Sequence, residues 1–301
     1  MKNITNKKKK LIVILGPNAS GKTDISIKLA KKFNGEIISA DSRQVYKKMN
    51  IGTGKITKKE MNNIPHYLLD VVEPKTRFTV SKYQKLANKA IKKIFKNNKI
   101  PFIVGGTGFY IDSVIDGVII PAVKPDWKLR KKLEKENIEK LFKMLKKLDP
   151  KRAGIIESKN KRRLIRAIEI IIKTKKPVPL LKKIKPKFDV LILGIKKEMP
   201  ELKKRIEIRL LKRLKSGMIA EVKKLKQSGV SWKRLEEFGL EYKYIALFLQ
   251  NKLTKDEMIT KLQKEIEHYA KRQRTWFKRD KRIHWVKNYK QSEQLIKKFL
   301  K

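Results

Sequence analysis

The sequence contains no cysteine and only three histidines among its 301 residues. The absence of cysteine excludes a disulfide framework, a zinc site built on thiolates and a cysteine nucleophile. No apolar run approaches the roughly 20 residues that a membrane-spanning helix needs. The apolar run at 11–15 is also shorter than the core of a signal peptide, about 7–15 residues. We therefore expect a soluble, cytoplasmic protein that makes no contact with a membrane.

Acidic residues are scarce compared with basic ones. The chain has 79 Lys and Arg against 29 Asp and Glu, which leaves a formal net charge of +50. The excess is denser after residue 122 than before it. A strongly basic surface attracts polyanions, so RNA is the first partner to consider. A Lys-rich composition also arises in proteins from AT-rich genomes, where many lysines are merely solvated, and the charge alone does not decide between these two explanations.

Short apolar runs alternate with stretches of helical periodicity. This alternation predicts an α/β fold with a doubly wound parallel sheet of the P-loop NTPase type. The runs predicted to form strands are 11–15, 36–40, 66–72, 100–104, 189–195 and 283–286. The main helices are predicted over 23–33, 79–96, 198–214, 218–227, 241–250 and 255–279.

The pattern changes in the middle of the chain. Residues 123–186 are basic and helical in periodicity, with breaks at Asp149-Pro150 and at Pro177-Val178-Pro179. We predict that 123–186 form a helical insertion, and that 1–122 and 187–301 together form one α/β core with C-terminal helices.

Residues 16–23 fit the pattern G-x-x-x-x-G-K-[ST] at every fixed position, between a predicted strand and a predicted helix. In this motif backbone N–H groups and the positive end of the helix hold phosphate oxygens. Lys22 adds a positive charge, and the hydroxyl of Thr23 is placed to hold Mg²⁺. A chance Gly-rich turn is the alternative. The predicted diphosphate-binding residues of this loop are Gly16, Pro17, Asn18, Ala19, Ser20, Gly21, Lys22 and Thr23.

The motif does not say which reaction follows. ATPases and GTPases of this class usually carry a carboxylate at the end of a further strand, whereas the strand at 100–104 ends in Gly105-Gly106-Thr107. Asp41 follows the strand at 36–40 instead. Ligands of open α/β sheets bind at the carboxyl ends of the strands, so we expect Asp41 and Thr107 in one crevice. The alternative for Asp41 is a residue that only caps the turn before Ser42.

Several segments, together with this loop, resemble the tRNA dimethylallyltransferase (tRNA isopentenyltransferase) family of the bacterial type. The order and spacing agree over nearly the whole chain, which makes the resemblance far more specific than the loop alone. The absence of cysteine fits the bacterial members, which lack a zinc finger. The segments that carry the resemblance are 41–46, 51–55, 65–70, 105–110, 162–169 and 270–277.

The resemblance implies a reaction and its participants. A dimethylallyl group passes from dimethylallyl diphosphate to N6 of the adenosine on the 3′ side of the anticodon in tRNA, and diphosphate is released. Asp41 would deprotonate the flipped-out adenine, which agrees with the need for a general base at a weakly nucleophilic amine. Thr107 would hydrogen-bond near the reacting centre. The expected cofactor is Mg²⁺, and the expected partners are the anticodon stem-loop of tRNA and the allylic diphosphate, bound by a monomer.

Arginines of the insertion are implied at both substrates. Arg163 and Arg166 would contact the diphosphate, and as residues three apart they share a helix face. The alternative is a solvated basic helix. The residues predicted to bind tRNA are Asp41, Ser42, Arg43, Gln44, Arg130, Arg162, Arg163, Leu164, Ile165, Arg166, Lys271, Arg272 and Arg274.

Trp276 and the three histidines are less informative. A tryptophan beside a basic run can stack on a base, but at helical spacing we favour a core position for Trp276. His66, His268 and His284 are too scattered to indicate a metal site, and His66 is expected in a loop or behind the residues that touch the substrate.

Two other functions remain open from the residues alone. A P-loop kinase of small metabolites would share the phosphate loop and the aspartate, but it explains neither the basic insertion nor the segment 105–110. A non-catalytic RNA-binding protein with a vestigial loop would explain the charge. Phosphoryl transfer from ATP would support the first, and tight tRNA binding without product would support the second.

Overall fold

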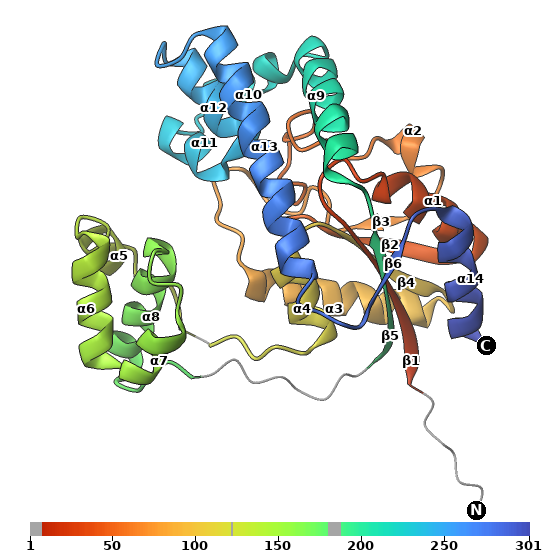
Figure 1. Cartoon of the computed structure of the whole chain (residues 1–301), viewed down its shortest axis with the longest axis horizontal. Coiled ribbons are helices and arrows are strands. Elements are labelled where there is room, and N and C mark those ends of the chain that lie inside the picture. The colour runs from red at the N-terminus through yellow and green to blue at the C-terminus, as the bar shows by residue number, and fades with distance from the viewer. Residues whose placement is uncertain (1–7, 122, 180–187) are drawn as a thin grey trace, which may run out of the picture. The chain divides into compact units, whose positions relative to one another are not determined.

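The computed structural model describes residues 8–121, 123–179 and 188–301 (Figure 1). The chain divides into two compact units, one formed by Met1–Gly117 with Lys185–Lys301 and the other by Val118–Ile184. The borders predicted from the sequence, after 122 and after 186, involve residues outside the described ranges.

The larger unit contains a six-stranded sheet in the order β3-β2-β4-β1-β5-β6. Every neighbouring pair is parallel, which confirms the predicted fold class. The strands are β1 (Lys9–Leu15), β2 (Gly35–Ala40), β3 (His66–Tyr67), β4 (Ile100–Gly105), β5 (Phe188–Ile195) and β6 (Ile283–Val286).

β3 is shorter than the strand predicted over 66–72. Leu68 and Asp70 both have positive φ, 66° and 54°, and extended backbone cannot continue through that region. Pairing resumes only as an isolated bridge between Val72 and Tyr46. The apolar residues of this segment therefore belong to a bent loop rather than to a strand.

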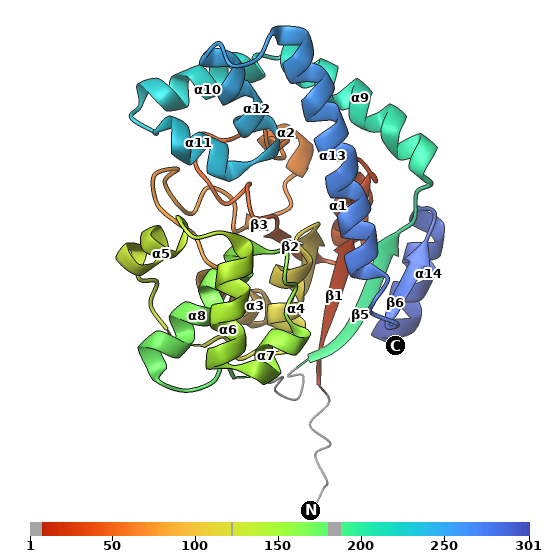
Figure 2. The same ribbon diagram turned by 60° about the vertical axis from the view of Figure 1, so that its left-hand side comes forward.

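Helices cover both faces of the sheet. α3 (Val80–Lys96) and α4 (Gly108–Ile115) lie on one face, and α1 (Lys22–Lys32) and α14 (Tyr289–Leu300) lie on the other (Figures 1 and 2). Successive strand residues point to opposite faces, and both faces are apolar. This explains why the central strands read as continuous apolar runs.

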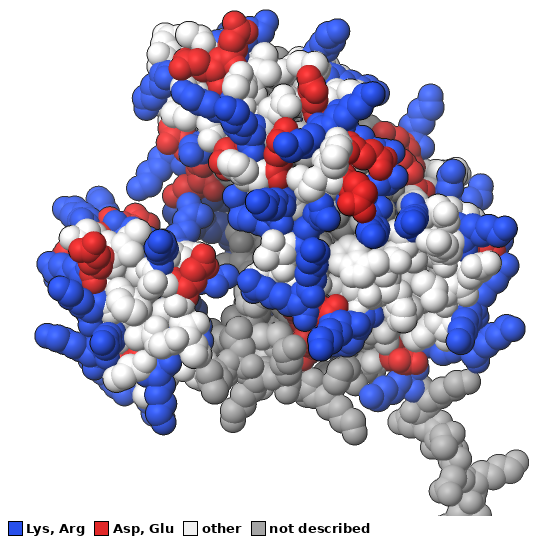
Figure 3. All heavy atoms as spheres, viewed as in Figure 1, with Lys and Arg blue, Asp and Glu red and all other residues white. Residues whose placement is uncertain are grey.

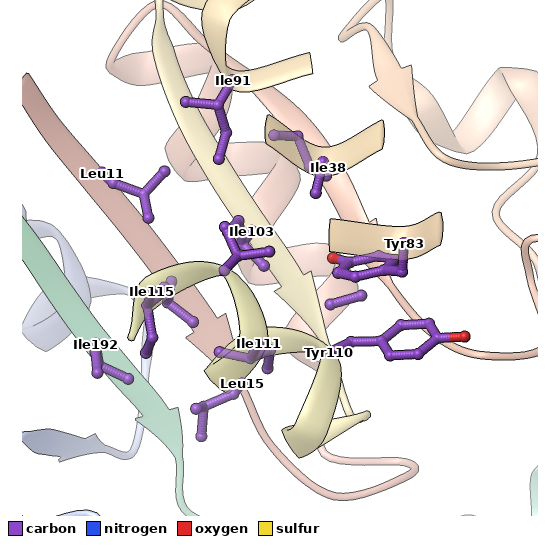
Figure 4. Close-up of a cluster of buried hydrophobic side chains, with 14 of the residues drawn as sticks. Leu11, Leu15, Ile38, Tyr83, Ile91, Ile103, Tyr110, Ile111, Ile115 and Ile192 are labelled. Carbon is purple, nitrogen blue, oxygen red and sulfur yellow. The ribbon is translucent and has the colours of Figure 1, made fainter. Parts of the chain in front are cut away.

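β1 shows the alternation directly. Leu11 and Leu15 pack with side chains of α3 and α4, as Figure 4 shows, whereas Ile12 and Ile14 pack on the side of α1 and α14. All four side chains are buried. The sheet is thus a rigid platform, and its carboxyl edge carries the loops described below.

A second group of helices in the larger unit has its own apolar core. α13 is the longest helix described and runs from this group to α4 (Figures 1 and 2). The helix predicted over 198–214 is confirmed as α9, on which Leu202, Ile206 and Leu210 are buried. The helices are α9 (Met199–Lys215), α10 (Met218–Gln227), α11 (Trp232–Phe238), α12 (Leu240–Leu249) and α13 (Lys255–Phe277), and a short α2 (Lys58–Met61) lies in the loop before β3.

The smaller unit is helical and also has its own core. The predicted break at Asp149-Pro150 separates two helices, because Asp149 ends one and its Oδ1 accepts a hydrogen bond from the backbone N–H of Arg152, 2.9 Å, at the start of the next. The helices are α5 (Trp127–Leu133), α6 (Ile138–Leu148), α7 (Pro150–Ile155) and α8 (Lys161–Thr174).

Basic side chains cover much of the visible surface of each unit, with acidic side chains interspersed (Figure 3). Within the described ranges, no helix is both long enough and apolar enough to span a bilayer.

Candidate active site

The loop between β1 and α1 has the backbone of a phosphate cradle. Ala19 and Gly21 have positive φ, 63° and 83°, and a Cβ at Gly16 would lie only 2.8 Å from Ser20 Oγ. α1 then begins at Lys22, and the N–H groups of its first turn have no intrahelical partner. Together with the positive end of the helix, these groups favour an anion at the loop.

Lys22 is held inside this loop. Its Nζ donates a hydrogen bond of 3.2 Å to the carbonyl oxygen of Pro17. Burial lowers the pKa of Lys22 to about 8; the charge of Asp41 opposes this shift, and the charges of Arg209 and Arg213 add to it. The lysine is therefore close to one carboxylate and two guanidinium groups, and an arriving diphosphate would favour its charged form.

Asp41 directly follows β2 at the carboxyl edge of the sheet. Its Oδ1 accepts hydrogen bonds from the backbone N–H groups of Arg43, 2.8 Å, and Gln44, 3.3 Å. Asp41 is partly exposed, and no described residue donates a hydrogen bond to its Oδ2. One oxygen thus fixes the carboxylate, and the other is available to accept a proton.

Thr107 lies beside Asp41, as predicted. The preceding strands pair so that Ala40 faces Gly105, and Thr107 Oγ1 accepts a hydrogen bond of 3.1 Å from the backbone N–H of Ser42. Tyr269 of α13 shares a further hydrogen bond with Thr107; burial, followed by the charge of Asp41, raises the pKa of this tyrosine to about 12. Sequence reasoning did not find Tyr269, because a helix more than 150 residues away supplies it.

Arg43 and Gln44 are bound to the protein itself. Arg43 Nε donates to the carbonyl oxygen of Phe238, 2.7 Å. The amide of Gln44 accepts from Ser39 Oγ, 3.3 Å, and donates to the carbonyl oxygen of Gly54, 3.3 Å. In this structure both side chains brace the loop after β2, and their predicted contacts with tRNA stay predictions.

Three arginines of α9 form a row that sequence reasoning missed. They are spaced by four, so they share one face of the helix. A Cβ at Gly54 would lie 1.8 Å from Arg213 Nη2 and 3.2 Å from Arg209 Nη2, and a Cβ at Gly21 would lie 3.8 Å from Arg205 Nη1. The row therefore points at the phosphate loop and at the loop around Gly54. The i, i+4 repeat was the available signal, but nothing local shows where the helix packs.

Glu221 of α10 fixes the loop at 50–54 through hydrogen bonds. Its carboxylate accepts hydrogen bonds from the backbone N–H groups of Asn50, 2.8 Å, Ile51, 2.7 Å, and Gly52, 3.0 Å. Tyr242 adds its hydroxyl, 2.7 Å. This fixes the segment against which Arg213 and Gln44 pack.

Two predicted arginines of the smaller unit bind one buried carboxylate. Arg130 contacts Glu169 through two hydrogen bonds, 2.8 and 2.7 Å, and Arg166 contacts Glu169 and the carbonyl oxygen of Val123. Burial raises the pKa of the Glu169 carboxyl, but the bonds from these arginines outweigh it and the pKa is lowered. Both arginines thus have a structural partner, and the predicted roles at diphosphate and tRNA remain predictions.

The neighbouring residues of α8 divide by exposure. Leu164 and Ile165 are buried, 0 and 5% exposed, in the core of the smaller unit. This corrects the prediction that they contact tRNA, because the apolar stripe of an amphipathic helix faces its core. Arg162 and Arg163 are exposed, and Arg163 pairs with Glu157 at 3.3 Å.

The basic run of α13 lies at the surface, and its tryptophan is half-buried. Lys271 and Arg272 are exposed and Arg274 is partly exposed. Trp276 packs against a buried cluster and donates a hydrogen bond to Asp112 Oδ2, 3.1 Å. Trp276 therefore packs at the edge of the core, so the core position favoured for it is confirmed only in part.

Thr23 is the residue predicted to hold Mg²⁺. It is exposed in the first turn of α1, and its hydroxyl has no hydrogen bond within the described residues, so it is free to meet a ligand.

His66 bonds the carbonyl oxygen of Ile64 through Nδ1 at 2.8 Å. The described residues contain no group of three His, Cys, Asp or Glu that could hold a metal by itself.

Comparison with known proteins identifies the family. The family model described as IPP transferase matches residues 44–280, which is most of the chain. The chain belongs to the IPP transferase family. The matched range includes Thr107, whereas the phosphate loop and Asp41 precede it.

Relatives and solved structures agree over nearly the full length. A tRNA dimethylallyltransferase of Carboxydothermus hydrogenoformans is 44% identical over 95% of this chain and 94% of its own. A second, from Halothermothrix orenii, is 41% identical over 99% and 94%. The crystal structure of tRNA isopentenylpyrophosphate transferase from Bacillus halodurans has a TM-score of 0.73 at 36% identity, covering 97% of this chain and 96% of that one. A eukaryotic dimethylallyltransferase acting on tRNA gives a TM-score of 0.76 at 31% identity, over 89% and 69%.

Proposed function

We propose that this IPP transferase family member transfers a dimethylallyl group from dimethylallyl diphosphate to N6 of the adenosine 3′ to the anticodon in tRNA. The N6–C bond forms as the allylic C–O bond breaks, the N6 proton passes to Asp41, and diphosphate leaves. The observation that carries the proposal is that the phosphate loop and the Asp41–Thr107 pair lie at the same carboxyl edge of the sheet. Lys22 of the phosphate loop lies within the electrostatic reach of Asp41, and Asp41 is tied to Thr107 through Ser42.

The phosphate loop would hold the leaving group. Negative charge builds on the diphosphate as the C–O bond breaks, and preorganised donors stabilise that charge. The first-turn N–H groups of α1, the ammonium of Lys22 and the guanidinium groups of Arg209 and Arg213 are the groups of this unit suited to it. These groups would thus lower the barrier to breaking the C–O bond.

Asp41 and Thr107 would serve the other reactant. The amino group of adenine is a weak nucleophile because its lone pair is delocalised, and a positioned carboxylate that takes its proton contributes about 10²–10⁴ in rate. Asp41 Oδ2 is suited to that role, since the protein occupies only Oδ1. Thr107 and Tyr269 bring hydroxyl groups to the same place.

Mg²⁺ fits the donor set of the loop. This ion prefers oxygen ligands and commonly combines one or two protein groups with phosphate oxygens and water. The Thr23 hydroxyl would supply a protein ligand and the diphosphate would supply others. When bound, the ion would offset charge on the leaving group.

The exposed basic residues would bind tRNA. Phosphate contacts from Lys and Arg supply affinity without sequence reading, and that affinity can offset the few kcal/mol needed to flip the adenine out of its stack. Lys271, Arg272, Arg162 and Arg163 are exposed and basic, so they are the proposed contacts. The monomeric state and the cytoplasmic location remain predictions.

Labelled transfer tests the proposal. Purified protein would be incubated with Mg²⁺, dimethylallyl diphosphate labelled in the allyl group, and unmodified tRNA with adenosine 3′ to the anticodon. Label in the RNA, located at that adenosine after nuclease digestion, supports the proposal. A folded protein that binds both substrates and leaves the RNA unlabelled would overturn it. Transfer of phosphate from ATP to a small acceptor in a parallel reaction would favour the kinase alternative.

A further inference from the structure

Gln273 is a polar residue in the buried stripe of α13. Its side chain is buried, with only 5% of the residue exposed. Burial of an amide costs free energy unless its donor and acceptor are bonded, so its partners determine what it does. The other buried positions of this helix are apolar: Met258, Leu262, Ile266, Ala270 and Phe277.

The amide of Gln273 joins two loops that are far apart in the sequence. Its Oε1 accepts a hydrogen bond of 2.9 Å from the backbone N–H of Asn18, and its Nε2 donates one of 2.9 Å to the carbonyl oxygen of Gly106. The partners fix the orientation of the amide, because only the oxygen can face an N–H and only the NH₂ can face a carbonyl.

The two loops lie close to each other at this bridge. A Cβ at Gly106 would lie 2.2 Å from Gln273 Nε2 and 3.4 Å from the carbonyl oxygen of Gly16. The turn after β4 therefore approaches the phosphate loop closely, with the amide between them. Glycine at 106 is needed for this close approach rather than for a special φ.

The two bridged loops carry the two halves of the site. Asn18 belongs to the phosphate loop, and Gly106 precedes Thr107, which is bonded to Ser42 beside Asp41. We propose that Gln273 is a positioning residue that sets the separation between the bound diphosphate and the Asp41–Thr107 pair. This inference rests on the proposed function.

The separation matters because the reaction is a displacement. The allylic C–O bond breaks with its electron pair going to diphosphate, while N6 of adenine bonds to the same carbon and Asp41 receives the N6 proton. Leaving group and base act on opposite ends of this array. A displacement of about 1 Å between such groups can lower the rate about 100-fold.

The variant Gln273→Glu tests the bridge with almost no change in shape. As a neutral acid, the new side chain can accept from Asn18 through its carbonyl oxygen and donate to Gly106 through its hydroxyl. As a carboxylate it has only acceptor oxygens. One of them would face the Gly106 carbonyl oxygen, which it would repel instead of donating a hydrogen bond to it. Burial raises the pKa of a carboxyl group, so this change of state occurs above the ordinary range of a glutamate.

The expected result is a pH profile that the native protein lacks. The ratio of single-turnover rates, Gln273→Glu to wild type, should be within about threefold of one at the acid end. It should fall about 100-fold as pH rises, while the dissociation constants for tRNA and for inorganic diphosphate change by less than about threefold. Taking the ratio removes any pH dependence that the two proteins share.

A structural role alone would give a different result. If Gln273 only satisfied buried groups, the rate per folded molecule would not change, and any loss would follow the folded fraction measured by circular dichroism at each pH. A flat ratio in a folded variant would also overturn the inference. Gln227→Glu is the matched control, since Gln227 is exposed and the variant adds the same charge; its ratio should stay near one at every pH.

A second variant keeps the test decisive if the glutamate variant folds poorly. Gln273→Met has a similar length and can make neither hydrogen bond. It should lower the single-turnover rate about 100-fold at every pH, with substrate dissociation constants within about threefold. An unchanged rate in Gln273→Met would overturn the inference. Absence of transfer by the wild-type protein would instead overturn the proposed function, so the two failures are distinguishable.

Discussion

The backbone N–H of Ser42 donates a hydrogen bond of 3.1 Å to Thr107 Oγ1. This bond joins the turn after β2 to the turn after the neighbouring strand β4. It keeps Asp41, one residue before Ser42, beside the threonine hydroxyl. The proposed acid–base half of the site is thus built on paired strands, which hold functional groups more rigidly than isolated loops.

Removing the Thr107 hydroxyl should slow transfer. Thr107→Val leaves the Ser42 N–H without its acceptor, and an unsatisfied buried donor costs about 1–3 kcal/mol. We expect the single-turnover rate to fall about tenfold or more. Thr107→Ser keeps the oxygen and should retain most of the rate. Equal rates for the two variants would show that the bond does not position Asp41.

Binding of the allylic diphosphate should weaken in alkaline solution. Burial lowers the pKa of Lys22 to about 8, so above pH 8 a growing fraction of the free protein lacks the ammonium charge. We expect kcat/KM for dimethylallyl diphosphate to fall about tenfold per pH unit there, and binding to take up protons in calorimetry. The side chain in Lys22→Arg stays charged, so this variant should lack the fall in kcat/KM above pH 8 (the alkaline limb). If the alkaline limb remained in Lys22→Arg, Lys22 would be excluded as the titrating group.

Arg209 of α9 should affect the protonation of Lys22. Its charge lowers the pKa of Lys22, so Arg209→Gln should move the alkaline limb to higher pH. The variant should also raise KM for dimethylallyl diphosphate about tenfold, because a hydrogen bond to a charged group is worth about 1.5–3 kcal/mol. Lys204→Gln is the control, since Lys204 is an exposed cation of the same helix. Equal changes in both variants would indicate a general charge effect.

The buried carboxylate of Glu169 should stabilise the smaller unit. Glu169→Gln leaves Arg130 and Arg166 without their anion, and breaking a buried pair costs about 3–5 kcal/mol. Hydrogen exchange in α8 should accelerate accordingly, and KM for tRNA should rise. Because the pKa of Glu169 is lowered, the native contribution is full above the ordinary pKa of a glutamate and is lost as pH falls through the lowered value.

Glu157→Gln provides the comparison for that experiment. Glu157 pairs with Arg163 at the surface, and exposed pairs are worth about 0–1 kcal/mol. Little change in exchange is expected. If Glu169→Gln and Glu157→Gln behaved alike, the buried arrangement would not be what holds the unit together.

Local patterns were sufficient for the sheet and the phosphate loop. The strands buried on both faces read as continuous apolar runs, and the motif at 16–23 lies wholly within one turn. The segment 66–72 misled because its apolar composition suits a strand, whereas the positive φ of Leu68 and Asp70 bends the chain. Composition did not show those backbone angles.

Residues supplied by distant helices could not be predicted from local patterns. The arginine row of α9 repeats every four residues, yet only tertiary packing shows that it faces the phosphate loop. Tyr269 and Gln273 lie on α13, and their partners precede them by more than 150 positions. Leu164 and Ile165 were predicted to bind tRNA because they lie within a family motif. They form part of the core of the smaller unit instead.

The single-turnover rate of Asp41→Asn tests the central claim most directly. Asparagine keeps an oxygen to accept from Arg43 and Gln44, so the turn survives, but it cannot take the N6 proton. With labelled dimethylallyl diphosphate and unmodified tRNA, the rate should fall about 10²–10⁴-fold, while the dissociation constant for tRNA changes by less than about threefold. A rate equal to that of the wild-type protein would contradict the role of Asp41 as the base.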